Sequence, residues 1–291
     1  MKVSALTLIH NRADLLCDAV ASVLSQSYPV HELIAIDDGS TEDVKAVLDS
    51  FNDARIKYYR YKHGQMISKL RNIALSKASG DVMAFIDSDD KWHPDKIKIH
   101  VEDLLATSCV ISFSDCRLFD AKGWIGRPVC EDMNKQNTMF REMTERNQSI
   151  AFGSNLFFQR SIAGEEVKFD ERLYSGEHDL VLMLCARYKS SYIDQVLNYI
   201  RRHDRNISSL SSSDIISPLE YNHTLDKLKR SGFMSDALYK RIKAGNYANV
   251  GLAYLKKKRY KKSRAFLMEA LKHDAKWSYV KVLVKALIGL Q

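Results

Sequence analysis

The feature that most constrains the fold is the regular alternation of short apolar runs with longer amphipathic runs through the first 107 residues. Each of four β-type segments precedes a segment with helical periodicity; the four are VSALTLI (3–9), ELIAID (32–37), RIKYYRY (55–61) and DVMAFID (81–87). Strands that alternate with helices favour a parallel, doubly wound sheet. We therefore predict an α/β fold, with a mostly parallel sheet flanked by helices.

The next hundred residues follow a less regular pattern. Three further segments have strand character, CVISFSDCRLF (109–119), SNLFFQR (154–160) and SYIDQVLNYIRRH (191–203), and the second half of 168–188 is helical in type. Within the first hundred residues, Thr41 can cap a helix and Gly80 lies where a glycine often follows a helix end.

Charge and composition divide the chain in two. Residues 218–291 carry 17 Lys and Arg against 5 Asp and Glu, whereas residues 1–217 carry 27 against 31. Between them, residues 204–218 contain six serines and no aromatic residue, as expected of a connecting segment. We predict a domain at 1–210, a linker at 211–217 and a small, basic, all-helical domain at 218–291.

The helical segment 246–277 resembles a single tetratricopeptide-type helix pair, with small residues at Gly251 and Ala253. One such pair cannot bury its own apolar face. It must therefore pack on its own chain or on a second subunit, and the oligomeric state stays open.

The five cysteines form no C-x-x-C pair, which argues against a disulfide framework and a thiolate zinc site. They are expected to be free thiols in the reducing cytoplasm. No apolar run approaches the length that spans a bilayer. The basic run KKKRYKK (256–262) has a solvated helix face as its default interpretation. Peripheral contact with the anionic inner face of a membrane is the alternative, and no nucleic-acid motif accompanies the charge.

Polar clusters follow three of the predicted strands at their carboxyl ends: His10-Asn11, Asp37-Asp38-Gly39-Ser40 and Asp87-Ser88-Asp89-Asp90. Ligands of doubly wound sheets bind at this edge. Asp87 and Asp89 are placed to hold one divalent cation, which leaves other positions for phosphate oxygens and water. A solvated loop that caps the next helix is the alternative. We expect Asp38 and Asp90 to be loop hydrogen-bonding residues instead of ligands.

Two longer stretches resemble family 2 glycosyltransferases of the GT-A fold: HNRADLLCDAVASVLSQSYPVHELIAIDDGSTEDV (10–44) and GQMISKLRNIALSKASGDVMAFIDSDDKWHPDKI (64–97). Weaker similarity continues to about residue 210, and the helical tail lies outside it. The resemblance implies an inverting transfer of a sugar from a nucleotide-diphospho-sugar, with UDP as the expected nucleotide and Mn²⁺ or Mg²⁺ as the cofactor.

The resemblance also implies roles for individual residues. His10 would lie against the nucleobase, and Asp37 would accept a hydrogen bond from it. Arg71 would approach the nucleotide, and Asp87 would contact the ribose. Asp89 would ligate the metal.

Two late motifs supply the remaining implied roles. Arg202 and His203 would lie near the diphosphate and the metal, respectively. The family's base is the Asp of a Glu-Asp pair, and this chain departs from that pattern with Glu177-His178-Asp179. Asp179 is the favoured base because the following residues fit the family's helix best in that register, with Glu177 left open.

The expected function is transfer of a sugar to a glycan or lipid-linked glycan acceptor in the synthesis of cell-surface polysaccharide or lipooligosaccharide, inside the cell. A nucleotidyltransferase is one alternative, which the absence of a glycine-rich first turn disfavours. A non-catalytic nucleotide-sugar-binding protein is the other, and the altered Glu-His-Asp motif keeps it open.

Overall fold

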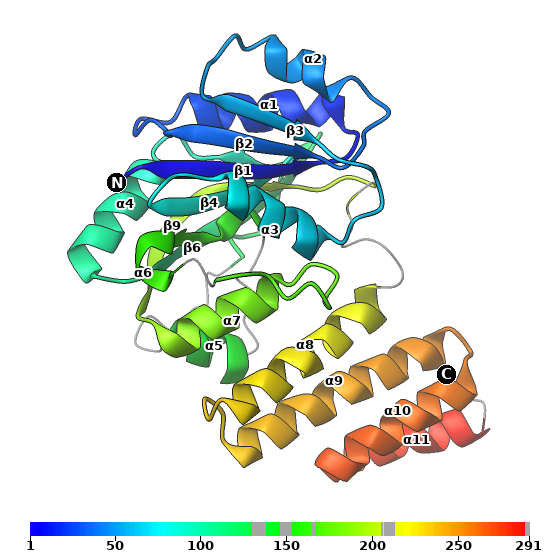
Figure 1. Ribbon diagram of the computed structural model, residues 1–291. Helices are drawn as coiled ribbons and strands as arrows, with labels where there is room; N and C mark the ends of the chain where they lie inside the picture. The colour runs from blue at the N-terminus through cyan, green and yellow to red at the C-terminus, as the bar shows by residue number, and fades with distance from the viewer. Residues whose placement is uncertain (130–137, 146–152, 165–166, 205, 207–212, 289–291) are drawn as a thin grey trace. The chain divides into compact units, whose positions relative to one another are not determined.

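The computed structural model describes residues 1–129, 138–145, 153–164, 167–204, 206 and 213–288. The chain divides into two compact units, Met1–His203 and Asp204–Gln291. The first is a sheet flanked by helices, and all the described elements of the second are helices (Figure 1).

Four parallel strands form one side of the sheet in the first unit. They lie in the order β3-β2-β1-β4, and their bounds are β1 Val3–Ile9, β2 Glu32–Asp37, β3 Ile56–Arg60 and β4 Val82–Asp87. The helices that alternate with them are α1 Ala13–Leu24, α2 Val44–Asp49, α3 Ile67–Lys77 and α4 Lys96–Thr107. The predicted α/β alternation is confirmed.

The other side of the sheet is mixed. The strand order continues β8-β6-β9-β5, with β8 antiparallel to both β4 and β6, and β7 pairs with β6. The strands are β5 Lys91–Trp92, β6 Ile111–Asp120, β7 Gly123–Ile125, β8 Phe157–Gln159 and β9 Ser190–Arg201. The helical elements here are α5 Met139–Glu145, the 3₁₀ turn η1 Gly153–Asn155, α6 Arg160–Ala163 and α7 Glu177–Arg187.

The register of the strands aligns the carboxyl ends of β1, β2 and β4. Ile9 of β1 pairs with Asp37 of β2, and Leu8 of β1 pairs with Asp87 of β4. Because β1 lies between β2 and β4, the residues that follow all three strands emerge at one edge. Since β8 is antiparallel to β4, the η1 turn before it also arrives there.

One carboxylate is buried at the opposite, amino end of the sheet. Glu32 is fully buried and accepts hydrogen bonds from Ser4 Oγ at 2.6 Å, Lys57 Nζ at 2.5 Å and the Ser79 N–H at 2.6 Å. Burial alone would raise its pKa, but the bonds from Lys57, Ser4 and Ser79 outweigh burial and lower the pKa to about 2. Glu32 is therefore a paired structural carboxylate.

Thr41 and Gly80 do not have the helix-capping roles that the sequence suggested. Asp43, instead of Thr41, caps α2 by accepting the Ala46 N–H at 3.0 Å. Gly80 does not end α3 in a left-handed turn; a Cβ there would lie 2.6 Å from Ser4 Oγ, so glycine is needed for close packing against β1.

The second unit contains α8 Ser213–Arg230, α9 Asp236–Lys256, α10 Tyr260–His273 and α11 Trp277–Ile288. Each helix packs on the next along the chain. A Cβ at Gly251 would lie 2.8 Å from Leu267 Cγ, so glycine permits the close approach of α9 and α10. Since α8 begins at Ser213, residues 213–217 of the expected linker are helical.

The four cysteines that the structure describes are all free thiols. Cys109, Cys116 and Cys185 are buried free thiols, Cys17 is a free but exposed thiol, and Cys130 lies outside the described residues. Within the described ranges, no helix combines the length and the apolar character required to cross a membrane.

Candidate active site

Three carboxylates gather where β4 ends. One oxygen from each of Asp87, Asp89 and Asp90 lies within 4.8 Å of the others, which is close enough to hold a metal ion. Asp89 and Asp90 are buried, at 4% and 3% exposure. Oxygen donors in this number suit Mg²⁺ or Mn²⁺.

The acidity of the cluster reflects this crowding. Burial, followed by the charge of Glu177, raises the pKa of Asp87 to about 7. Burial and the charges of Asp87 and Asp89 also raise the pKa of Asp90 well above its ordinary value. A cation bound among these carboxylates would relieve both the desolvation and the repulsion, so the donor set fits a divalent metal.

Asp89 is held from both ends of the first unit. Its Oδ2 lies 2.8 Å from Arg12 Nη1 and 2.8 Å from His203 Nε2. Arg12 and its neighbour Asn11 both have left-handed backbone conformations, with φ of 68° and 57°. The expected pairing of Asp89 with His203 at one site is thus present in the structure, and Arg12 is an addition that the sequence did not indicate.

Asp90 and Asp87 are tied to later segments of the chain. Ser154 Oγ donates to Asp90 Oδ2 at 2.6 Å and accepts the Asp87 N–H at 2.9 Å. The Arg201 N–H donates to Asp90 Oδ1 at 2.8 Å, and Arg201 Nε donates to the Asp89 carbonyl at 2.8 Å. Asp90 is therefore a loop hydrogen-bonding residue, as expected.

Helix α7 begins beside this cluster. Its first residue, Glu177, forms an ion pair with Arg71, which also donates to the Ser175 carbonyl at 2.8 Å. A Cβ at Gly153 would lie 2.7 Å from both Asp87 Oδ1 and Glu177 Oε1. Glycine at this position therefore leaves room for the two carboxylates to approach each other.

The two candidate bases differ in accessibility. The Glu177 side chain is 15% exposed, whereas Asp179, in the same first turn of α7, is only 2% exposed. The structure thus brings Glu177, and not Asp179, into the group formed with Asp87 and Arg71.

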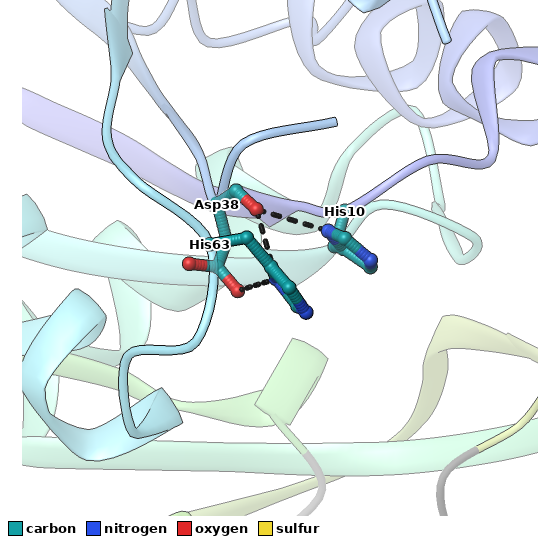
Figure 2. Close-up of side chains that lie close together, drawn as sticks. All are labelled: His10, Asp38 and His63. Carbon is teal, nitrogen blue, oxygen red and sulfur yellow. Dashed lines mark hydrogen bonds and ion pairs between the residues drawn. The ribbon is translucent and has the colours of Figure 1, made fainter. Parts of the chain in front are cut away.

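A second polar group lies beyond β1 and β2 (Figure 2). The rings of His10 and His63 stack with centroids 4.0 Å apart and an angle of 14° between planes. Both Nδ1 atoms lie near the Asp38 carbonyl, at 3.0 and 3.1 Å, and His63 Nδ1 also lies 2.7 Å from Asp38 Oδ2.

This group is less suited to a metal than the carboxylate cluster. His10, Asp38 and His63 offer three ligand atoms within 4.8 Å of one another. However, the Nδ1 atoms of both rings are already engaged by the Asp38 carbonyl, at 3.0 and 3.1 Å, and a metal bound there would have to displace these contacts. The arrangement instead presents flat aromatic rings beside a carboxylate, which suits a planar ligand.

Both carboxylate oxygens of Asp37 already accept hydrogen bonds within the protein. It is fully buried, its Oδ1 accepts from the Ser40 N–H and Oγ, and its Oδ2 accepts from Tyr58 at 2.6 Å. Burial and Asp37 raise the pKa of Tyr58 to about 12, which keeps its phenol a donor. Asp38 Oδ1, by contrast, is buried with no hydrogen-bond partner among the described residues.

Arg202 directly follows β9, and its N–H donates to the Phe119 carbonyl at 2.7 Å. It therefore lies next to His203 at the carboxyl edge. The sequence did not single out His63, Ser154 or Arg201, although each contacts one of the predicted acidic residues.

The sheet order and the carboxylates at its edge define a protein of the GT-A fold. The structure of S. aureus TarS 1–349 in complex with UDP-GlcNAc aligns with 99% of this chain and 88% of that one, with a TM-score of 0.71 and 14% sequence identity. At that identity the likeness concerns the fold alone.

Residues 4–165 match the sequence profile of glycosyl transferase family 2, and the chain belongs to this family. It is 37% identical over 123 residues to the glycosyltransferase TuaG of Bacillus subtilis, which is assigned to teichuronic acid biosynthesis; the match covers 42% of this chain and 49% of TuaG. It is 27% identical over 139 residues to the Escherichia coli UDP-Glc:alpha-D-GlcNAc-diphosphoundecaprenol beta-1,3-glucosyltransferase WfgD, covering 48% of this chain and 55% of WfgD.

These matches are partial. The chain spans between about a third and a half of the lengths of the first curated relatives it matches.

Proposed function

We propose that this protein is a metal-dependent, inverting glycosyltransferase that uses a UDP-sugar donor. The observation that carries the proposal is the group of buried carboxylates at the carboxyl ends of the strands, with Glu177 and Arg71 beside it. UDP-GlcNAc is the ligand in the TarS complex, and WfgD is a UDP-Glc glucosyltransferase, which supports UDP as the nucleotide.

The metal would be Mn²⁺ or Mg²⁺, held by Asp89 with Asp87 and assisted by His203. A cation in this position would neutralise charge on the departing diphosphate. Arg12 and His203 both contact Asp89 now, and they orient its carboxylate. Arg202 is proposed to meet the diphosphate, because it lies next to His203 at the same edge.

The nucleobase would bind at the His10–His63 ring pair, with a carboxylate accepting one of its N–H groups. The resemblance assigns that acceptor to Asp37, but Asp37 is fully buried and already accepts three hydrogen bonds, which favours its neighbour. We propose Asp38 instead. Its Oδ2 has one hydrogen bond, to His63, and its Oδ1 has none among the described residues. Rotation of the carboxylate toward a nucleobase would therefore break no hydrogen bond of Oδ1.

The reaction requires a base that takes the proton of the acceptor hydroxyl as its oxygen attacks C1 of the donor sugar. The bond between C1 and the diphosphate breaks as the new bond forms on the opposite face, which inverts C1. A base must reach the hydroxyl, and accessibility favours Glu177 over the buried Asp179. Arg71 is proposed to position Glu177 through their ion pair.

The acceptor is proposed to be a glycan or lipid-linked glycan used for cell-surface polysaccharide, on the inner side of the membrane. The similarity to TuaG, which is assigned to teichuronic acid biosynthesis, and to WfgD, whose acceptor is GlcNAc-diphosphoundecaprenol, supports this class. A non-catalytic sugar-nucleotide-binding protein is the competing reading, and the accessible Glu177 beside the metal cluster argues against it.

The first test is calorimetric titration of UDP, GDP, CMP and TDP with and without Mn²⁺. We expect selective, Mn²⁺-dependent binding of UDP, lost in Asp89→Asn but kept in Glu102→Gln, a matched change at an exposed position on α4. Equal binding with and without the metal would remove the cation from the proposal.

A second test separates the candidate bases. Transfer from a UDP-sugar is measured for Glu177→Gln and Asp179→Asn, with UDP binding as a control for site integrity. We expect Glu177→Gln to lower kcat by about a hundredfold or more while UDP still binds. Loss of kcat in Asp179→Asn alone would return the role to Asp179, and full activity in both variants would exclude a base on this helix.

A further inference from the structure

The last helix, α11, has two different faces. One packs into the core of the second unit, where Ala286 is buried and Tyr279, Val282 and Leu283 are partly buried. The other is exposed and apolar. It carries the apolar stripe of α11, which we define as Trp277, Val284, Leu287 and Ile288, with exposures of 70%, 47%, 57% and 62%.

The stripe follows from helical spacing. Val284 and Ile288 lie seven and eleven positions after Trp277, so the three share one face, and Leu287 lies at its margin. Lys281 and Lys285 are exposed along the other margin. The chain has no acidic residue after Asp274, and residues 218–291 carry an excess of twelve positive charges.

From this arrangement we propose that the apolar stripe of α11 docks on an anionic lipid surface. A helix that lies in a membrane interface has apolar residues, often with Trp, on one face and basic residues beside them. The apolar side chains enter the boundary between headgroups and acyl chains, while the lysines meet lipid phosphates.

Two observations favour a lipid surface over a protein partner. A stable protein interface takes about 20–30 residues from each side, whereas the stripe consists of four side chains on a single helix. The basic margin also matches a negatively charged surface. The inference differs from contact through 256–262, since that run spans the end of α9, the turn and the start of α10, and has no apolar stripe of its own.

The test is co-sedimentation of the full chain with vesicles of phosphatidylcholine alone or of phosphatidylcholine and phosphatidylglycerol in equal amounts. We expect binding to the anionic vesicles only, weakened by salt. Leu287→Glu and the double change Lys281→Gln/Lys285→Gln should each lower vesicle binding about tenfold or more.

Matched controls locate the surface. Met268→Glu adds the same charge at an exposed apolar position on α10, and Lys257→Gln/Lys258→Gln removes two charges from the 256–262 run; both should bind as the wild type does. Tryptophan emission should shift to the blue on vesicle binding, and the shift should vanish in Trp277→Phe. Circular dichroism verifies that each variant is folded.

Three results would overturn the inference: no binding to anionic vesicles, loss of binding in Lys257→Gln/Lys258→Gln with Leu287→Glu unaffected, or equal binding to neutral vesicles. A concentration-dependent dimer that Leu287→Glu dissolves would also overturn it and assign the stripe to a second copy. Since no donor is present in these measurements, their failure leaves the proposed reaction unaffected.

Discussion

Carboxylates lie at both ends of the parallel part of the sheet, and they behave in opposite ways. Glu32, the first residue of β2, is fully buried yet has its pKa lowered to about 2 by Lys57, Ser4 and Ser79. Asp87, the last residue of β4, has its pKa raised to about 7 by burial and by the charge of Glu177. Desolvation raises the pKa of both, so their partners make the difference.

Under the proposed function, this contrast separates the structural carboxylate Glu32 from the carboxylates of the proposed metal site. Where the chain supplies its own cation and hydroxyl donors, the charge is satisfied and supports folding. Where carboxylates face one another, the charge is left for a ligand to satisfy, at some expense in stability. Substitutions at the two ends should therefore separate activity from stability.

The largest effect is expected at the carboxyl end. Asp89→Asn should lower kcat/KM for sugar transfer by about a thousandfold, or ~4 kcal/mol, because it removes the proposed metal ligand. Thermal unfolding should change little, since the buried negative charge is lost together with its ion pairs. Steady-state kinetics beside a melting curve measures both, and a variant that transfers sugar normally would place the metal elsewhere.

At the amino end the expected loss is of stability. Glu32→Gln should lower the free energy of unfolding by about 2–3 kcal/mol, with kcat unchanged well below the melting temperature. Because the folded pKa is below the unfolded value of 4.5, this stabilisation is present above pH 4.5 and is lost as the pH falls toward 2. The free energies of urea unfolding of the wild type and of Glu32→Gln should thus converge between pH 6 and pH 2.5. If the difference between the two free energies of unfolding stayed the same at every pH, Glu32 would not be the acid-sensitive group.

A smaller effect should distinguish the adjacent carboxylates after β2. Asp38→Asn should raise the KM for the UDP-sugar about tenfold (~1.4 kcal/mol) with the melting temperature retained. Asp37→Asn should instead lower the melting temperature, because Ser40 and Tyr58 both donate to it. The reverse assignment of KM and stability effects would restore Asp37 to the nucleobase.

The smallest expected effect is a gain in the free energy of unfolding. With chelator present, Asp87→Asn should raise the free energy of unfolding at pH 8 by about 1 kcal/mol, since it removes a repelled charge. Differential scanning calorimetry can resolve the change. Destabilisation by the same variant would mean that Asp87 is paired in the metal-free protein more strongly than its raised pKa implies.

The sequence predicted the first half of the sheet well because its signals are local. An apolar run followed by an amphipathic run marks each of β1 to β4, and the acidic residues that end β2 and β4 directly indicate the edge where the carboxylates gather. Membership in the family, inferred from residues 10–97, is confirmed by the match over residues 4–165.

The remaining site depends on contacts between distant residues. Nothing next to Ser154 or Arg201 indicates that they bind Asp90, and the stacking of His63 on His10 requires the fold. The difference between Asp37 and Asp38 was also hidden, because adjacent identical residues carry no signal for which one the Ser40 turn will use. Solvent exposure, which distinguishes Glu177 from Asp179, is likewise a property of packing.

The hydrogen bonds of Asp89 also bear on how the protein folds during its synthesis. Its two side-chain partners, Arg12 and His203, lie 77 and 114 residues away along the chain. Contacts so far apart form late, because the loops between them must close first. During synthesis, which proceeds from the amino terminus, the acidic centre stays incomplete until β9 has left the ribosome and paired. Cation binding by a nascent chain would therefore mark the moment at which the whole first unit has folded.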